Sequence, residues 1–320
     1  MNAVYAGVDL GGTTIHAALA TRAGDILCQE TIPTESHAGP VAVLKRIAEL
    51  VRALAARIQA DPQAVGMGVP GLVDVASGTT RFLPNLPTQW RDVEAGRILS
   101  EQLGCPVRLL NDVRIATLGE LTYGHGREAQ SLVFLALGTG IGGGVAVDGQ
   151  LRLGPLGAAG ELGHLTVLPD GPLCGCGNRG CLETLASGPA IIGEAVRLLK
   201  TGLAPRLFDL VQGDAGRVSP KEIAAAAQAG DAAVQDSLRR ASEYLGIGVA
   251  NVIVTLHPDL VVFGGGVAQM GDVLLEPVRE TVRRRVRMFP SETVRIEISQ
   301  LGDRAGVLGA VALACRPSTN

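Results

Sequence analysis

The spacing of apolar residues divides the first third of this chain into strands and a helix. Three short apolar segments are separated by Gly11-Gly12 and by a polar turn at 22–25, which predicts a meander of strands. From 41 to 58 apolar residues recur as they do on one face of a helix. The predicted strands of the meander span 4–8, 15–20 and 26–32, and further short buried strands are expected at 65–69 and 107–110.

The second half repeats this pattern. A strand at 132–137 leads through a glycine-rich turn at 138–144 into strands at 145–147 and 151–153, which resemble the N-terminal meander at low identity. Because helices and strands alternate along the rest of the chain, an α/β fold is expected. A helix is expected to begin where the strand at 107–110 ends, at Asn111 and Asp112, and to run to about Tyr123. Further helices are predicted at 189–200 with Ser187 as its cap, at 232–255, near 272–287 and at about 305–315, and another is opened by a capping box at Ser219 and Glu222. The remaining predicted strands are 260–263 and 294–298.

Composition and charge narrow the class of protein. The chain has 320 residues, 47% of them hydrophobic, and a formal net charge of −3, so it can bury a large core and offers no positive field for general nucleic-acid binding. Residues 1–12 lack the basic start and apolar core of a secretory signal. The longest uncharged run, at 129–147, contains five glycines and is poor material for a membrane span. We therefore expect a cytoplasmic protein without a membrane segment.

Glycine is the unusual component, with 43 residues. Three glycine turns are candidates for binding phosphate through exposed backbone N–H groups, although any one of them alone is more often simply the turn of a tight hairpin. The middle turn matches G-x-G-x-x-G, but a strand follows it where a dinucleotide site requires a helix. No lysine stands in a P-loop motif. The turns are DLGGT (9–13), GTGIGGG (138–144) and GGGV (264–267).

Polar side chains accompany these turns and suggest a nucleotide. Thr13 and Thr139 place hydroxyl donors where phosphate oxygens would lie, and Asp9 is placed to hold Mg²⁺ directly or through water. The predicted nucleotide site consists of Asp9, Gly11, Gly12, Thr13, Gly138, Thr139, Gly140, Gly264, Gly265 and Gly266.

Seven segments occur in an order that resembles the ROK family of bacterial sugar kinases and sugar-responsive repressors, and the resemblance covers essentially the whole chain. The segments are DLGGT, GVPG (68–71), NDxxxxxLGE (111–120), GTGIGGG, GELGH (160–164), CGCGNRGCLE (174–183) and GGGV. The resemblance implies a two-lobed, duplicated actin-like and hexokinase-like α/β fold with a sugar cleft between the lobes. It implies a small lobe of residues 1–117 with the C-terminal helix at 305–320. The large lobe, residues 118–304, would carry a zinc loop and most of the ATP·Mg site.

The same resemblance assigns the general base to Asp112. An aspartate is too weak to deprotonate a sugar alcohol beforehand, but the loose transition state of phosphoryl transfer lets an aligned carboxylate accept the proton late. The alternative for Asp112 is a helix N-cap. Asn85, within LPNLP, is equally compatible with a plain turn. The sugar ligands that the resemblance implies are Asn85, Asn111, Asp112, Glu161, His164 and Glu183.

A metal site is expected around the clustered cysteines. Cys174, Cys176 and Cys181 supply three soft ligands, and the resemblance adds His164 as the fourth. A Cys₃His set is closed, so the expected ion is a structural Zn²⁺ that braces the loop and orients His164. Three ordinary loop cysteines are the alternative, but the intervening glycines supply the turns that wrapping a metal requires.

The implied activity is ATP-dependent phosphorylation of a hexose, with glucose to glucose 6-phosphate as the leading reaction. Kinases for N-acetylglucosamine, N-acetylmannosamine or fructose share these motifs. A non-catalytic, sugar-sensing regulator is the alternative of another class, but family repressors carry a helix-turn-helix domain before DLGGT, and eight residues precede Asp9 here. We expect a hexose and ATP as partners, no nucleic acid, and a homo-oligomer, either dimer or tetramer.

Two positions depart from the commoner family pattern. Arg114 follows the Asn-Asp pair where many members have small residues and a second asparagine, which leaves open which sugar is accepted. Thr14 stands where a lysine is frequent, so a positive charge near the phosphates is missing. Neither difference removes a predicted catalytic group.

Overall fold

The computed structural model describes residues 3–316, and the chain divides into two compact units. Of the described residues, the first unit contains 3–129, 144–159 and 299–316. The second unit contains 130–143 and 160–298. Neither unit is one continuous stretch, because the chain passes between them more than once.

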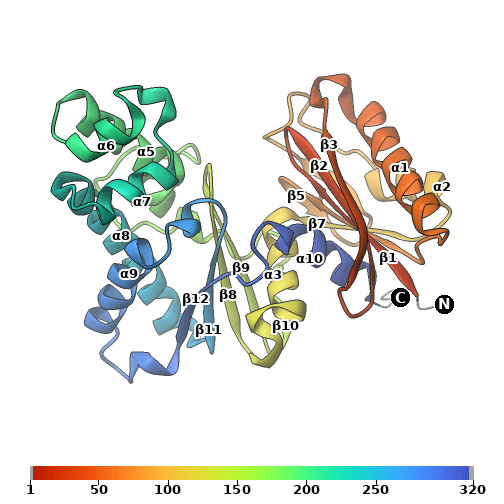
Figure 1. The fold of residues 1–320 in the computed structure, drawn as a ribbon. Helices are drawn as coiled ribbons and strands as arrows, with labels where there is room; N and C mark the ends of the chain where they lie inside the picture. The colour runs from red at the N-terminus through yellow and green to blue at the C-terminus, as the bar shows by residue number, and fades with distance from the viewer. Residues whose placement is uncertain (1–2, 317–320) are drawn as a thin grey trace. The chain divides into compact units, whose positions relative to one another are not determined.

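The first unit is built on a five-stranded sheet with the order β3-β2-β1-β4-β7 (Figure 1). The first three strands form an antiparallel meander, and β4 and β7 run parallel to β1 on its other side. A two-stranded hairpin, β5 with β6, follows β4. The strands are β1 (Val4–Leu10), β2 (Thr14–Thr21), β3 (Ile26–Pro33), β4 (Val65–Val69), β5 (Leu72–Asp74), β6 (Thr79–Phe82) and β7 (Val107–Asn111).

Two helices cover one face of this sheet. α1 (Gly39–Ile58) and α2 (Ala95–Leu103) place Leu44, Ile47 and Leu99 in one apolar core with the strands. These side chains are fully buried, and burying each contributes about 1.5–3 kcal/mol relative to leaving it exposed. The apolar residues that recur at helical spacing after residue 40 therefore form the face of α1 that packs on the sheet.

The other face is covered by α3 (Asp112–Tyr123) and α10 (Ala305–Ala314), which pack against each other (Figure 1). α10 also contacts β1 and β4. It lies so close to the sheet that a Cβ at Gly66 would collide with the carbonyl oxygen of Ala310. This close approach places the C-terminal helix in the first unit.

The second sheet has the order β10-β9-β8-β11-β12. In each five-stranded sheet the earliest strand is central, the next two lie on one side, and the last two lie on the other. This shared topology confirms the α/β duplication that the repeated apolar pattern predicted. The strands are β8 (Leu132–Leu137), β9 (Ile141–Val147), β10 (Gln150–Leu151), β11 (Leu260–Gly264) and β12 (Arg295–Ile298).

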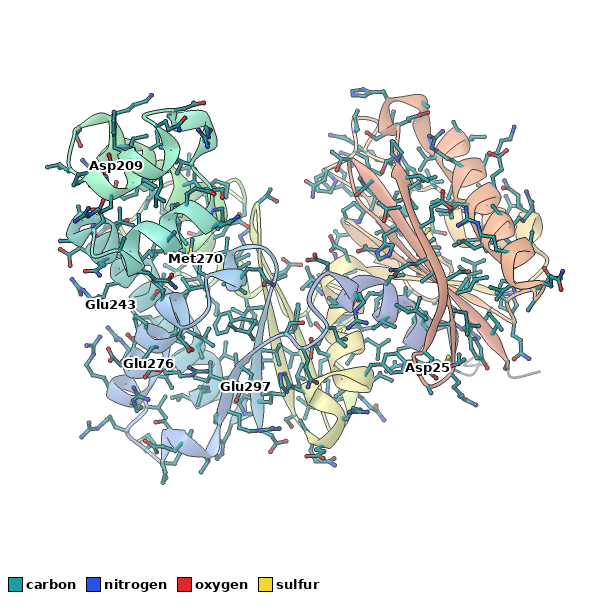
Figure 2. The ribbon with its side chains drawn as sticks, viewed as in Figure 1. Asp25, Asp209, Glu243, Met270, Glu276 and Glu297 are labelled. Atoms are coloured by element: carbon teal, nitrogen blue, oxygen red, sulfur yellow. The ribbon has the colours of Figure 1, made fainter. Side chains whose placement is uncertain are left out.

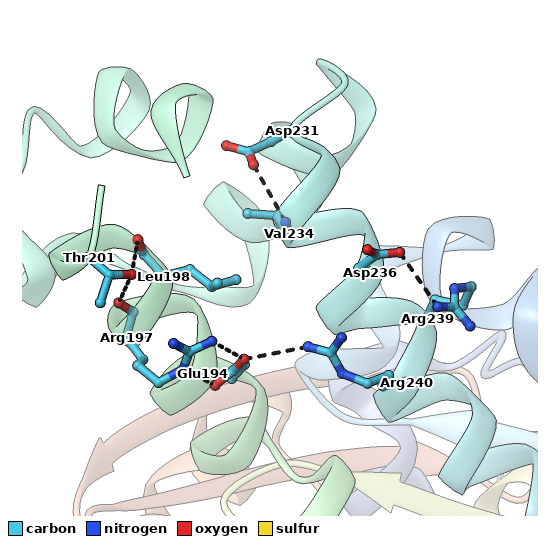
Figure 3. Close-up of polar contacts among 9 residues, drawn as sticks. All are labelled: Glu194, Arg197, Leu198, Thr201, Asp231, Val234, Asp236, Arg239 and Arg240. Atoms are coloured by element: carbon cyan, nitrogen blue, oxygen red, sulfur yellow. Dashed lines mark hydrogen bonds and ion pairs between the residues drawn. The ribbon is translucent and has the colours of Figure 1, made fainter. Parts of the chain in front are cut away.

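Helices make up most of the second unit. On α8 and α9, Glu243 and Glu276 lie on the outer surface and form ion pairs with Arg239 and Arg283 (Figure 2). Glu194 of α5 binds both Arg197 of its own helix and Arg240 of α8 (Figure 3). The helices are α4 (Leu182–Ala186), α5 (Gly188–Lys200), α6 (Pro205–Val211), α7 (Pro220–Gln228), α8 (Ala232–Leu256) and α9 (Asp272–Arg285).

Several local predictions differ from the structure. β9 begins at Ile141, so the middle glycine turn is confined to 138–140 and its other glycines belong to a strand. Ser187 precedes α5 but makes no side-chain capping bond. Ser219 caps α7 by accepting the Lys221 N–H, and its hydroxyl donates to the Glu222 carboxylate. The hairpin β5–β6 and the helices α2, α4 and α6 were not predicted.

The boundary between the units also differs from the expected one. A boundary after residue 117 would cut α3, which is continuous to Tyr123. The structure keeps α3 and the residues to Ala129 in the first unit, because α3 packs on α10. Among residues 3–316, no helix combines the length and the apolar composition that crossing a bilayer requires.

Candidate active site

The candidate catalytic carboxylates lie at the carboxyl ends of parallel strands in the first unit. Asp9 of β1 pairs in register with Gly68 of β4, and Asn111, the last residue of β7, pairs with Val69. Asp112 follows as the first residue of α3. Open α/β sheets bind ligands at this edge. The strand pairing through β4 thus brings Asp9 and the Asn-Asp pair together from two distant parts of the sequence.

The carboxylate of Asp9 is enclosed by backbone. A Cβ at Gly68 would lie 3.3 Å from Asp9 Oδ1 and 3.7 Å from the Cα of Asp112. A Cβ at Gly306, in the first turn of α10, would collide with Asp9 Oδ2. Burial, together with the negative charge of Asp112, raises the pKa of Asp9 to about 7. A divalent cation would supply the positive charge that these carboxylates need, as the predicted role of Asp9 requires.

The raised pKa of Asp9 makes stability depend on pH. The folded pKa of about 7 exceeds the unfolded value of 3.8, so the contribution to stability is complete below pH ~4 and is lost as the pH rises through about 7. Without Mg²⁺, we expect the free energy of unfolding to fall on the order of 2–4 kcal/mol between pH 4 and 8 from this group. Thermal unfolding across that range measures the fall.

Asp9→Asn should remove this component of the pH profile. Asp209→Asn, which changes an exposed aspartate on α6 (Figure 2), should leave the profile unchanged. Equal slopes for the wild type and Asp9→Asn would show that Asp9 is ionised normally.

Asn111, and not Asp112, caps α3. The Asn111 Oδ1 accepts the N–H groups of Val113 at 3.0 Å and Arg114 at 3.3 Å. Asp112 is already helical, and its Oδ1 accepts from Val113 N at 2.8 Å. The alternative that Asp112 serves as the N-cap is therefore wrong. Capping is done by its neighbour, so the helix does not require the Asp112 carboxylate for that purpose.

Asn85 lies against the first glycine turn. A Cβ at Gly12 would be 3.0 Å from the Asn85 carbonyl oxygen. Thr34, which is buried, donates its hydroxyl to the Gly11 carbonyl and its N–H to the Thr13 carbonyl, both at 2.8 Å. Thr13 itself is exposed at the tip of the turn. Thr34 was missed in the sequence, because it is far from the turn along the chain and carries no motif.

In the second unit, the Glu183 carboxylate accepts a hydrogen bond at the end of the middle glycine turn. The Ile141 N–H donates to Glu183 Oε2 at 2.9 Å, and a Cβ at Gly140 would collide with the same oxygen. Gly138 N donates to the Gly140 carbonyl at 3.0 Å, which closes the turn, and Thr139 is exposed at its tip. The close approach of a carboxylate explains why residue 140 lacks a side chain.

The third glycine turn lies beside the second. Gly265 has a φ of +84°, and a Cβ there would collide with the Leu137 carbonyl oxygen at the end of β8. Gly188, the first residue of α5, donates its N–H to the Gly138 carbonyl at 2.9 Å, and its Cβ position is 3.4 Å from Val267 Cγ2. The turn itself consists of Gly264, Gly265 and Gly266.

Glu161 and His164 share one short 3₁₀ turn. The turn spans Leu162–His164, and the His164 N–H donates to the Glu161 carbonyl at 3.1 Å. Gly163 packs directly on β9, because a Cβ there would collide with the carbonyl oxygen of Ile141. The turn is therefore fixed against the same residue whose N–H holds Glu183.

Four side chains form a metal-sized cluster. The ligand atoms of His164, Cys174, Cys176 and Cys181 all lie within 4.8 Å of one another. His164 Nδ1 is 3.6 Å from Cys174 Sγ, and Cys176 Sγ is 3.7 Å from Cys181 Sγ. Tetrahedral zinc with Zn–S of about 2.3 Å and Zn–N of about 2.0 Å requires separations of roughly 3.5–3.8 Å. These two separations match a tetrahedral zinc site.

The metal-sized cluster leads directly into the residue that binds the middle glycine turn. Cys181 is fully buried and is the N-cap residue of α4, whose first turn carries Glu183. Burial and the adjacent thiols of Cys176 and Cys174 raise the pKa of Cys181 to about 12. A bound cation would reverse this by favouring the thiolate.

Comparisons with known proteins agree with this geometry. A family model described as the ROK family matches residues 5–316. The chain belongs to the ROK family. It is 36% identical to a glucokinase of Halalkalibacterium halodurans over 95% of this chain and 93% of that protein. It is 31% identical to a xylose repressor of Caldicellulosiruptor bescii over 96% of this chain and 77% of the repressor.

A solved ROK structure matches the fold. The crystal structure of a ROK family glucokinase from Streptomyces griseus in complex with glucose and AMPPNP gives a TM-score of 0.82 at 34% identity, covering 97% of this chain and 99% of that one. The ROK fold therefore extends over both units of this chain.

In this ROK protein the predicted residues form one group in each unit. In the first group, strand pairing brings Asp9 close to Asn111 and Asp112, and the charge of Asp112 contributes to the raised pKa of Asp9. Asn85 belongs to the same group because its carbonyl oxygen lies against Gly12. Contacts to Ile141 and Gly138 connect the second. The first group is Asp9, Gly11, Gly12, Thr13, Asn85, Asn111 and Asp112, and the second is Gly138, Thr139, Gly140, Glu161, His164, Cys174, Cys176, Cys181, Glu183, Gly264, Gly265 and Gly266.

Proposed function

We propose that this protein transfers the γ-phosphoryl group of ATP to the 6-hydroxyl of a hexose, with glucose as the preferred substrate. The observation that carries the proposal is the position of Asp112 at the carboxyl edge of the first sheet, beside Asp9 and relieved of capping by Asn111. The likeness to a glucokinase of H. halodurans, and to a ROK glucokinase structure that holds glucose and AMPPNP, supports the same reaction.

The residues of the first unit would handle the proton and the metal. Asp112 would align the 6-hydroxyl and accept its proton late, as the bond to phosphorus forms. Asp9 would hold Mg²⁺, directly or through water. Mg²⁺ would neutralise charge on the phosphate oxygens of ATP. The turn at Gly11 and Gly12 would let the backbone approach these oxygens closely.

The residues of the second unit would bind the rest of the nucleotide and the sugar. The turns at Gly138–Gly140 and Gly264–Gly266 present backbone to the phosphates. Glu161, His164 and Glu183 would bind sugar hydroxyls through groups that a wrong ligand would leave unpaired. His164 Nδ1 faces Cys174 Sγ, so a zinc ion held there would leave Nε2 for the sugar and would orient a binding residue.

The direct test is an ADP-release assay with ATP, Mg²⁺ and a panel of glucose, mannose, fructose, N-acetylglucosamine and N-acetylmannosamine. We expect release that depends on Mg²⁺ and on the sugar, with the highest kcat/KM for glucose. No release with any sugar would contradict the proposal. A higher kcat/KM for an amino sugar would retain the reaction and change the substrate.

Trp90 offers an independent measure of sugar binding. It is the single tryptophan of the chain, it is buried, and it lies in the segment that also carries Asn85. Its carbonyl accepts the Thr80 hydroxyl at 2.8 Å, and the Leu83 N–H binds the Gln89 carbonyl at 2.9 Å, so the segment is ordered around it. We expect glucose, but not an L-sugar control, to change its fluorescence in a saturable way.

A further inference from the structure

Arg114 is a cation buried in an unfavourable place. It lies in the first turn of α3, where the helix dipole disfavours positive charge, and it is 3% exposed. A buried guanidinium is costly unless its N–H groups are bonded. The hydrogen-bond partners of the guanidinium therefore indicate its role.

The guanidinium of Arg114 connects the Asn111 side chain, beside the candidate base, to the backbone of Ala159. Nη1 donates to Asn111 Oδ1 at 3.0 Å. Nε and Nη2 both donate to the Ala159 carbonyl, at 3.2 and 2.9 Å. Ala159 stands two residues before Glu161 in the sequence. Arg114 thus bonds the amide beside Asp112 and anchors the segment that leads to a second predicted sugar ligand.

These contacts fix the orientation of the Asn111 amide. Its Oδ1 accepts three donors: the N–H of Val113, the N–H of Arg114 and the Arg114 guanidinium. Its Nδ2 donates one proton to the Gly71 carbonyl at 3.2 Å. With the oxygen saturated, the group that Asn111 has left for a ligand is the second Nδ2 proton.

We propose that Arg114 is a positioning residue for sugar recognition, which fixes Asn111 as a hydrogen-bond donor to an acceptor oxygen of the sugar and holds the segment before Glu161. This inference rests on the proposed hexose kinase function. Capping of α3 needs only the two backbone N–H groups, so the guanidinium bond to Asn111 adds orientation that the helix does not require.

A double-mutant cycle separates this role from a general effect on folding. Arg114→Met removes the donors and keeps an apolar stem, and Asn111→Ser keeps an N-cap residue but removes the amide. We expect each variant to raise the KM for glucose by about 10–50-fold, with kcat changed less than about threefold. Because the bond between Arg114 and Asn111 is lost in either variant, the double variant should raise the KM by clearly less than the product of the two single effects.

A matched control is available on the surface of the second unit. Arg279 makes the same paired bond, from Nε and Nη2, to the Ile296 carbonyl at 3.2 and 2.8 Å. Arg279→Met should leave the KM for glucose unchanged. If Arg114→Met does not fold, Arg114→Lys keeps the charge with a single donor group, and a KM raised by a smaller factor is expected.

The role of Arg114 would be overturned if the increase in KM of the double variant equalled the product of the two single increases. An unchanged KM in both Arg114 variants would overturn it as well. A wild-type protein that phosphorylates no sugar would instead overturn the proposed kinase function. In that case the sugar dissociation constants from Trp90 fluorescence replace KM in the same cycle, and coupling between positions 111 and 114 still decides the role of Arg114.

Discussion

Replacing Asp112 by asparagine should lower kcat by about 10²–10⁴-fold, because the amide cannot accept the proton of the 6-hydroxyl. The change preserves the shape of the side chain and leaves the capping of α3 to Asn111. Glucose binding should therefore persist, with a dissociation constant within about fivefold of the wild type. Steady-state ADP release measures the first expectation, and a Trp90 fluorescence titration measures the second.

Asp112→Asn also has a predicted effect on its neighbour. The charge of Asp112 is one of the two causes that raise the pKa of Asp9, so removing it should lower that pKa. The variant should consequently lose less stability between pH 5 and 8 than the wild type. A kcat near the wild-type value would exclude Asp112 as the base, and a lost fluorescence response would show that the substitution disturbs the sugar site itself.

Removing a ligand of the metal-sized cluster should have the second large effect, on both stability and sugar binding. Cys176→Ser replaces the exposed cysteine of the cluster and should abolish stoichiometric zinc in protein purified without chelator. Cross-linking a loop as long as 164–181 stabilises by about 3 kcal/mol, so Tm should fall by roughly 6–12 °C. The KM for glucose should rise at least about tenfold, because metal-supported residues lose their orientation.

Cys105→Ser is the matched control. Cys105 is a half-buried free cysteine of the first unit and lies outside the cluster. Its serine variant should retain zinc and the wild-type KM. Wild-type protein with well under one zinc per chain by elemental analysis would contradict the zinc assignment, and equal zinc contents in both variants would exclude Cys176 as a ligand.

Contacts within the second unit connect the metal-sized cluster to the middle glycine turn. Cys181 begins α4, Glu183 follows in its first turn, and Glu183 holds the Ile141 N–H beside the middle glycine turn. Gly163, next to His164, packs on the same Ile141. The metal-sized cluster, two predicted sugar ligands and a predicted phosphate turn therefore share one short chain of contacts.

Local sequence signals sufficed for the long apolar elements. The strands at 65–69 and 132–137 were predicted with the bounds that the structure has, because a buried parallel strand is a continuous apolar run between turns. The repeat of the meander was visible for the same reason. By contrast, β5, β6 and α2 are short and partly exposed, so their apolar patterns are too weak to separate from loops.

The sequence did not determine which residue caps α3. Asn111 and Asp112 are both good cap residues in the sequence, so either could begin the helix. The structure decides for Asn111, because β7 extends through that residue and its amide oxygen reaches two N–H groups of the first turn. Arg114 is similar: its burial against Ala159 depends on a segment 45 positions away.

The sequence by itself determined the α/β class, the duplicated strand pattern, the three glycine turns and the grouping of three cysteines within eight residues. Only the tertiary structure decided that Gly306 lies against Asp9, that Thr34 supports the first turn, and that Glu183 is bound to Ile141. The physical reason is that the hydrophobic periodicity of a helix or strand depends only on residues that are close in the sequence. Contacts between distant residues instead depend on which strands pair and how closely helices approach the sheet.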